Sequence, residues 1–222
     1  MVKPEHYEEW YRSARGRWIG TVEYGILKSL LNADPNASLL DIGCGTGYFT
    51  RLFAQDMRGE VVGLDPNLEW LNYANTRSTK GERYVAGVAE VLPFPERSFD
   101  YTVSVTALCF VKNQEDALRE LVRVTRKRFA LGLLNRHSLL FRQKGRGEGT
   151  GAYQGAHWHT ASEMRRLLAS LPVINIRMCT AILLPQGGWI ARVVEQFWPQ
   201  NILLGGFLVV TGDIVESRRK VL

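Results

Sequence analysis

A short glycine-rich segment holds the residues of this chain whose types and spacing best suit ligand chemistry. Leu39 to Ile42 is an apolar run of the length of a buried parallel strand, and it leads into alternating glycines at positions 43, 45 and 47. Without a Cβ, these positions let the backbone approach a ligand closely. The helix predicted from Tyr48 to Gln55 then offers free N–H groups, which suit an anionic ligand group.

Two acidic residues accompany this turn. Asp41 immediately precedes it, where a carboxylate can accept hydrogen bonds from an ammonium group. The run from Glu60 to Asp65 predicts the next strand, and Asp65 ends it about twenty residues after the glycines, where Rossmann-like folds hold a ribose diol. The dinucleotide fingerprint requires Gly or Ala where this chain has Tyr48, so the pattern disfavours NAD.

Several segments of the sequence resemble the class I S-adenosylmethionine-dependent methyltransferases, and among them the small-molecule branch related to the ubiquinone and menaquinone methyltransferases. Leu40 to Gly47 matches the first motif of that family, and Gly63 to Asp65 matches the acidic end of its second strand. Ala89 to Pro95, with Ser98 to Asp100, matches its AExLPFP…SFD segment. The resemblance extends over roughly Glu5 to Leu171. It implies S-adenosyl-L-methionine as cofactor and S-adenosyl-L-homocysteine as product.

The resemblance also implies roles for individual residues. The glycines would allow the cofactor to approach, Asp41 would bind its methionine ammonium, and Asp65 would bind its ribose. Residues just after Asp65, together with Ala89 and Glu90, would form the adenine side. The cofactor-binding residues that we predict are Asp41, Gly43, Cys44, Gly45, Gly47, Asp65, Pro66, Ala89, Glu90 and Thr106.

The chain departs from related sequences at two places. Val88 stands where the family usually has an Asp that meets the adenine amino group, which leaves the backbone at Ala89 as the expected contact. The fourth predicted strand ends in Ser104 to Ala107. Enzymes that methylate nucleobase amino groups resemble one another here in having Asn or Asp, then Pro-Pro and an aromatic residue. Methylation of a nucleobase amino group is therefore disfavoured.

Methyl transfer from a sulfonium is an in-line displacement, so the protein mainly has to position the nucleophile and exclude water. We assign no catalytic base and predict no metal site. Tyr11, Tyr153, His157 and His159 are candidate contacts of a small-molecule acceptor. The alternative for each histidine is a loop or cap residue satisfied by the backbone, and histidines one residue apart do not form a helical metal pair. The acceptor, and whether its C, N, O or S atom is methylated, remain open.

Hydrophobic periodicity predicts the elements that position these residues. The resemblance implies an α/β fold, a Rossmann-like seven-stranded sheet that is mostly parallel with an antiparallel last strand and helices on both faces, and the periodicity agrees with it. The predicted strands are 39–42, 60–65, 83–86, 100–105, 129–134, 173–181 and 206–211. The predicted helices are 5–17, 18–31, 48–55, 66–76, 114–124, 160–171 and 189–197. The resemblance implies a turn after the fifth of them, but residues 126–128 replace the Pro-Gly-Gly of related sequences, so the geometry of that turn is left open.

We expect residues 1–222 to form a single methyltransferase domain with two covering segments. The resemblance implies that residues 1–32 form a helical cover over the cofactor pocket, and Tyr7, Trp10 and Tyr11 fall on one helical face there; the alternative is a helix packed on the core without ligand contact. Residues 136–160 lack periodicity and include a charged, glycine-rich stretch, which predicts a substrate lid. Residues 216–222 are expected to form a frayed tail.

The composition is that of a soluble globular protein, with 45% hydrophobic and 23% charged residues. The three cysteines are far apart and indicate neither a disulfide framework nor a zinc site. The start of the chain has no signal region, and no apolar run approaches the eighteen or so residues of a membrane helix. We therefore expect a cytoplasmic protein without a membrane span, and its oligomeric state is left open.

Two other functions remain compatible with the sequence. The chain could be a non-catalytic module that binds S-adenosylmethionine or a partner. It could also be an RNA or protein methyltransferase, a reading that draws on the net charge of +6. The basic residues concentrate at 123–128 and 136–146, where a solvated face is favoured over a nucleic-acid patch, so we do not expect nucleic acid as a partner.

Overall fold

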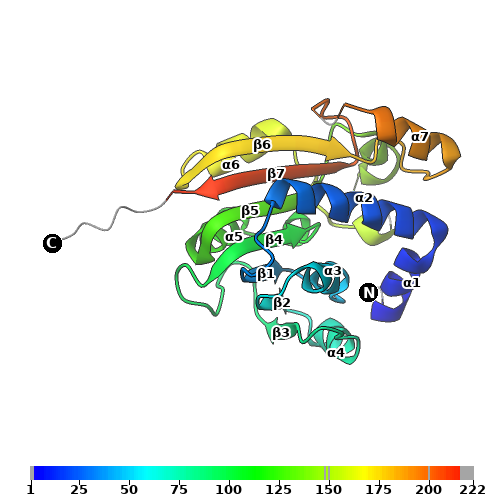
Figure 1. Ribbon diagram of the computed structural model, residues 1–222. Coiled ribbons are helices and arrows are strands. Elements are labelled where there is room, and N and C mark those ends of the chain that lie inside the picture. The colour runs from blue at the N-terminus through cyan, green and yellow to red at the C-terminus, as the bar shows by residue number, and fades with distance from the viewer. Residues whose placement is uncertain (1–2, 148, 150, 200, 216–222) are drawn as a thin grey trace.

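One seven-stranded sheet organises the part of the chain that the structure describes (Figure 1). The computed structural model describes residues 3–147, 149, 151–199 and 201–215. The strands are β1 (Leu39–Ile42), β2 (Val61–Asp65), β3 (Arg83–Ala86), β4 (Phe99–Val105), β5 (Thr125–Leu134), β6 (Val173–Ala181) and β7 (Phe207–Ile214). Their order is β3-β2-β1-β4-β5-β7-β6, with β7 antiparallel to both of its neighbours and every other pair parallel. The predicted Rossmann-like sheet is confirmed.

Helices cover both faces of this sheet and enclose two hydrophobic cores. The helices are α1 (Pro4–Arg12), α2 (Ala14–Leu31), α3 (Tyr48–Asp56), α4 (Leu68–Thr76), α5 (Gln114–Val124), α6 (Ala161–Leu168) and α7 (Trp189–Phe197). Leu27 of α2 and Val209 of β7 belong to one core, whereas Leu118 of α5 and Val210 of β7 belong to the other. Adjacent residues of a strand point to opposite faces, so β7 contributes to both cores.

The order in which the chain adds strands to the sheet reverses beside β1: β2 and β3 lie on one side of it, and β4 and β5 lie on the other. Strand β1 pairs in parallel with β2 on one side and with β4 on the other. In open α/β sheets a ligand binds outside the carboxyl ends of the strands at such a switch point. The glycine turn that follows β1 lies at this place.

The N-terminal segment is divided at a different residue from the one that the sequence predicted. We predicted helices at 5–17 and 18–31, but α1 ends and α2 begins at Ser13, whose backbone is extended. The Ser13 hydroxyl accepts a hydrogen bond from Gly16 N at 3.0 Å and donates one to the Trp10 carbonyl at 2.7 Å. A serine bonded in this way caps a helix rather than continuing one, because its side chain replaces a backbone partner.

The basic segment after α5 is not the predicted turn. Arg126 to Arg128 belong to β5, which follows α5 directly. Lys127 Nζ lies 3.2 Å from Asp100 Oδ1, and Arg128 Nε donates to Asp213 Oδ1 at 2.6 Å. These cations therefore have partners within the chain.

Smaller differences concern the ends of elements. Helix α6 begins at the predicted capping box, formed by Thr160 and Glu163, but ends at Leu168 rather than at residue 171. Residues 136–160 contain short helical turns at Phe141–Gly145 and Gly151–Tyr153. The predicted tail at 216–222 lies outside the described residues. None of the described helices is long and apolar enough to cross a bilayer.

The bonds of Ser13 predict a measurable contribution to stability. Ser13→Ala removes the cap of α2 and its bond to α1, so we expect the free energy of unfolding to fall by about 1 kcal/mol. Urea denaturation measures this loss. Ser170→Ala is the matched control, because Ser170 is exposed and lies beyond the end of α6. Equal stability of the two variants would show that the Ser13 cap contributes nothing.

Candidate functional site

A cavity of about 970 Å³ opens at the carboxyl ends of β1, β2 and β4. Nine of the ten residues that we predicted to bind a cofactor line it: Asp41, Gly43, Cys44, Gly45, Asp65, Pro66, Ala89, Glu90 and Thr106. The sheet therefore brings together residues that lie up to 65 positions apart in the sequence (106 − 41). The tenth residue, Gly47, does not line this cavity.

The glycines shape the floor of the cavity through their backbone. Gly43 has φ +76°, and a Cβ there would lie 2.2 Å from the Cβ of Ala107 beyond β4. The turn thus packs directly against the end of the neighbouring strand. Gly47 also has φ +76° and precedes the first residue of α3; a Cβ there would lie 2.4 Å from the Tyr84 hydroxyl. Its part in the site is to hold the turn.

Asp65 joins the ends of β1 and β2. Its Oδ2 accepts a hydrogen bond from Gly45 N at 2.9 Å, and its Oδ1 accepts one from Asn67 N at 2.9 Å. Burial raises the pKa of this carboxyl, while the two backbone donors oppose that rise. Each carboxylate oxygen can accept a second hydrogen bond, so Asp65 can still bind a pair of hydroxyl groups at the cavity wall.

Asp41 presents an unsatisfied oxygen beside the same cavity. Its Oδ2 accepts a hydrogen bond from the Thr50 hydroxyl at 2.7 Å, whereas its buried Oδ1 has no partner within the described part of the chain. Burial is the largest cause that raises the pKa of Asp41 to about 7, and the charge of Asp65 adds to it. A buried acceptor without a donor costs free energy, so this oxygen is suited to a ligand cation or N–H group.

Apolar side chains form another wall of the cavity. Leu118 and Leu121 of α5 line it together with Val88, which is 45% exposed. Trp70 of α4 lines it as well, and the sequence analysis did not identify this residue. Its position could have identified it, because Trp70 lies five residues after Asp65, in the helix that follows this acid.

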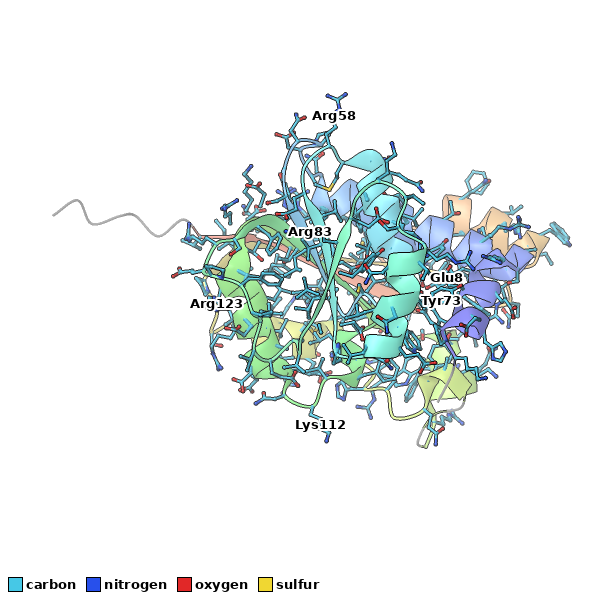
Figure 2. The ribbon with its side chains drawn as sticks, turned by 90° about the horizontal axis from the view of Figure 1, so that it is seen from below. Glu8, Arg58, Tyr73, Arg83, Lys112 and Arg123 are labelled. Carbon is cyan, nitrogen blue, oxygen red and sulfur yellow. The ribbon has the colours of Figure 1, made fainter. Side chains whose placement is uncertain are left out.

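Helix α1 is fixed to the glycine turn that lines the cavity. Glu8 accepts hydrogen bonds from the Thr46 hydroxyl at 2.8 Å and from Arg51 at 2.5 Å, and these two charged side chains are only 10% and 12% exposed. Arg51 also donates to the Thr46 carbonyl at 2.7 Å. From below, Glu8 on α1 lies beside α4, the helix that carries Tyr73 (Figure 2). Tyr7, the residue before Glu8, lines the cavity.

A second cavity of about 450 Å³ adjoins the first. The residues that line both are Tyr7, Thr106, Phe110 and Ala152. Thr106 has φ +54° at the end of β4, and its N–H donates to the Gly132 carbonyl at 2.7 Å. The two cavities therefore meet at the carboxyl end of β4.

Two of the four predicted substrate contacts line the second cavity. They are Tyr11, whose ring stacks on Tyr48 with centroids 3.7 Å apart, and Tyr153. Residues 136–160 contribute to both cavities, since Ala152 lines the two of them. The segments that we expected to be a cover (residues 1–32) and a lid (residues 136–160) thus each contribute lining residues to both cavities.

The two histidines lie away from both cavities. His159 is buried, with Nε2 3.0 Å from Gln114 Oε1, and burial lowers its pKa to about 4. His157 Nε2 lies 2.6 Å from Glu163 Oε1 at the start of α6. The side chains of both histidines therefore bond to side chains of this chain, Gln114 and Glu163, and not to the backbone groups that the alternative named.

Glu23 lines the second cavity and was missed by the sequence analysis. It lies on the stripe of α2 that also carries the buried residues Ile19 and Leu27, one turn to either side. Burial alone raises its pKa to about 8. A single carboxylate on an otherwise apolar helical stripe is the signal that could have identified it.

Residues 40–130 match the family model described as a methyltransferase domain. A malonyl-acyl-carrier-protein O-methyltransferase of Serratia marcescens is 32% identical over 151 residues, which are 68% of this chain and 54% of that protein. A ubiquinone/menaquinone biosynthesis C-methyltransferase of Ectopseudomonas mendocina is 40% identical over 97 residues, 40% of this chain and 38% of that protein. This chain thus spans about half or less of the length of these relatives.

The fold also matches solved structures. The crystal structure of an S-adenosylmethionine-dependent methyltransferase from Thermotoga maritima superposes with a TM-score of 0.73, at 24% identity and with 94% of each chain covered. Together, the family model, the relatives and this structure confirm the resemblance to the S-adenosylmethionine-dependent methyltransferases.

The ion pair between Glu8 and Arg51 predicts a large effect of one substitution. Glu8→Ala leaves the nearly buried Arg51 guanidinium without its carboxylate, so we expect the free energy of unfolding to fall by about 3 kcal/mol. Urea denaturation measures the change. Glu9→Ala, one position along α1 on its exposed side, should change stability by much less. Similar losses in both variants would contradict the assigned role of Glu8.

Proposed function

We propose that this chain, whose residues 40–130 match a methyltransferase domain, transfers the methyl group of S-adenosyl-L-methionine to a small-molecule acceptor by in-line displacement. One observation carries the proposal. Asp41 and Asp65 line one cavity at the ends of adjacent strands, and a second cavity meets the first at Thr106. This is the arrangement that a cofactor and an acceptor require, because the reaction needs both molecules in contact.

The cofactor would lie in the first cavity. Asp65 would accept hydrogen bonds from the two ribose hydroxyls, and the free Asp41 Oδ1 would accept one from the methionine ammonium. The backbone of the turn containing Gly43 and Gly45 would pass close to the cofactor, while Ala89 and the leucines of α5 would enclose its adenine. The residues fit the group, since the buried Asp41 oxygen needs a donor and the ammonium supplies one.

The acceptor would enter the second cavity and meet the methyl group near Thr106. Tyr11 and Tyr153 line this cavity and would contact the acceptor. Helix α1 and residues 136–160 contribute walls to both cavities, so their closure would exclude water from the reacting atoms. The chain's task is then positioning, because the sulfonium supplies the leaving group.

Turnover separates this proposal from a non-catalytic binding module. We expect S-adenosylhomocysteine to form when the protein is incubated with S-adenosylmethionine and a panel of small amines, phenols, thiols, carboxylates and quinones. Mass spectrometry detects both products. Tight cofactor binding without any methylated product across the panel would favour the binding module.

Asp65→Ala tests the ribose assignment. Loss of both charge-assisted hydrogen bonds should weaken binding of S-adenosylhomocysteine by tenfold or more, which corresponds to about 1.4 kcal/mol or more. Isothermal titration calorimetry measures the affinity. Asp56→Ala is the control, since it also removes one negative charge but lies at the exposed end of α3. An unchanged affinity in Asp65→Ala would remove the assignment.

Asp41 makes the binding dependent on pH. An ammonium beside Asp41 favours the carboxylate, so binding should lower its pKa from about 7 and release protons to solvent. Because the complex holds fewer protons than the free protein, affinity for S-adenosylhomocysteine should increase from pH 6 to pH 8. Calorimetry in buffers of different ionisation enthalpy counts the released protons. Asp41→Asn should abolish the release, and an equal release in that variant would exclude Asp41 as its source.

A further inference from the structure

Glu23 is an ionisable group that the proposed methyl transfer, as described so far, does not use. It lines the second cavity, beside the buried side chains of Ile19, Leu134 and Phe207. Burial is the only cause of its raised pKa, with no contribution from a donor or a cation. A carboxylate in such surroundings is costly unless something pairs with it. The cavity is therefore lined by a half-buried acid that the described part of this chain does not neutralise.

The groups that face Glu23 come from three segments. Tyr7 and Tyr11 of α1 and Tyr153 of the 136–160 segment line the same cavity, and Tyr48 of α3 stacks on Tyr11; the charge of Glu23 contributes to the raised pKa of each of these tyrosines. The basic residues of the lining, His6, Arg15 and Lys144, are all exposed. The cavity thus has a solvated basic rim and an acidic interior enclosed by aromatic rings.

We propose that Glu23 binds the ammonium group of the methyl acceptor and then accepts its proton, so that the acceptor is an amine. Aromatic rings with negative faces, together with a carboxylate, form a site that favours organic cations over neutral or anionic groups. The inference rests on the proposed function, because it concerns the acceptor of that same reaction.

The chemistry balances with these groups alone. The acceptor enters as an ammonium and transfers one proton to the Glu23 carboxylate, which leaves a neutral amine with a free electron pair. That pair forms the new N–C bond to the methyl carbon, while the C–S bond breaks and its electrons remain on sulfur. The products are a methylated ammonium, S-adenosylhomocysteine and one proton on Glu23, which leaves to solvent and restores the carboxylate. The raised pKa of Glu23 suits this step, because it brings the acid closer to the proton affinity of an amine.

Binding of two matched probes tests the proposal. The 222-residue protein is saturated with S-adenosylhomocysteine and titrated with 2-phenylethylamine or with its neutral analogue 2-phenylethanol, and ligand-observed NMR gives the affinities. At pH 8.5 we expect the amine to bind at least tenfold more tightly than the alcohol. Glu23→Gln should remove that preference and leave the alcohol unaffected. Glu9→Gln, an exposed carboxylate of α1, should bind both probes as the wild type does.

A pH series on the wild type alone keeps the proposal testable if Glu23→Gln does not fold. An alkylamine stays protonated to about pH 10, whereas Glu23 ionises around pH 8. Amine affinity should therefore rise between pH 6.5 and pH 9, and alcohol affinity should not. Equal binding of both probes at pH 9, or an amine preference retained in Glu23→Gln, would overturn the inference. Failure of S-adenosylhomocysteine itself to bind would instead overturn the proposed function.

Discussion

The hydrogen bond between Gly45 N and Asp65 Oδ2 is the contact on which the rest of the site depends. It connects the turn after β1 to the end of β2, across twenty residues of sequence. Because the donor is a backbone N–H, the bond fixes the path of the glycine turn and the orientation of the carboxylate at once. Each oxygen of the partly buried Asp65 can then accept one further hydrogen bond from a ligand. Asp41 on the adjoining strand has one oxygen, Oδ1, without any partner in the described part of the chain. The sheet register sets the separation of these two acids.

The covering elements depend on the same turn. Glu8 of α1 is bonded to Thr46 and to Arg51, one residue inside the turn and one in the helix after it. Helix α1 is therefore positioned by the glycine turn, and the bonds of Ser13 hold the junction between α1 and α2. Helix α2 in turn brings Glu23 to the second cavity. A change in the glycine turn would be transmitted through these contacts to both cavities.

The sequence predicted those parts of the molecule whose signals are local. The glycines, Asp41 and Asp65 are recognisable because each lies at the end of a short apolar run, and parallel strands necessarily bring such ends together. Trp70 and Glu23 were missed because their direction depends on how α4 and α2 rest on the sheet, which no local pattern specifies. Arg126 to Arg128 were assigned to a turn because their partners, Asp100 and Asp213, are remote in sequence. His157 and His159 were candidate substrate contacts in the sequence, yet in the fold their side chains bond to Glu163 and Gln114.

A crystal structure of the complex with S-adenosylhomocysteine is the most direct test of the central claim, that Asp41 and Asp65 together grip one nucleoside ligand. We expect both ribose hydroxyls within hydrogen-bonding distance of the Asp65 oxygens and the ligand amino group at Asp41 Oδ1. Ligand density that fills another part of the molecule, or that occupies this cavity without touching either carboxylate, would contradict it.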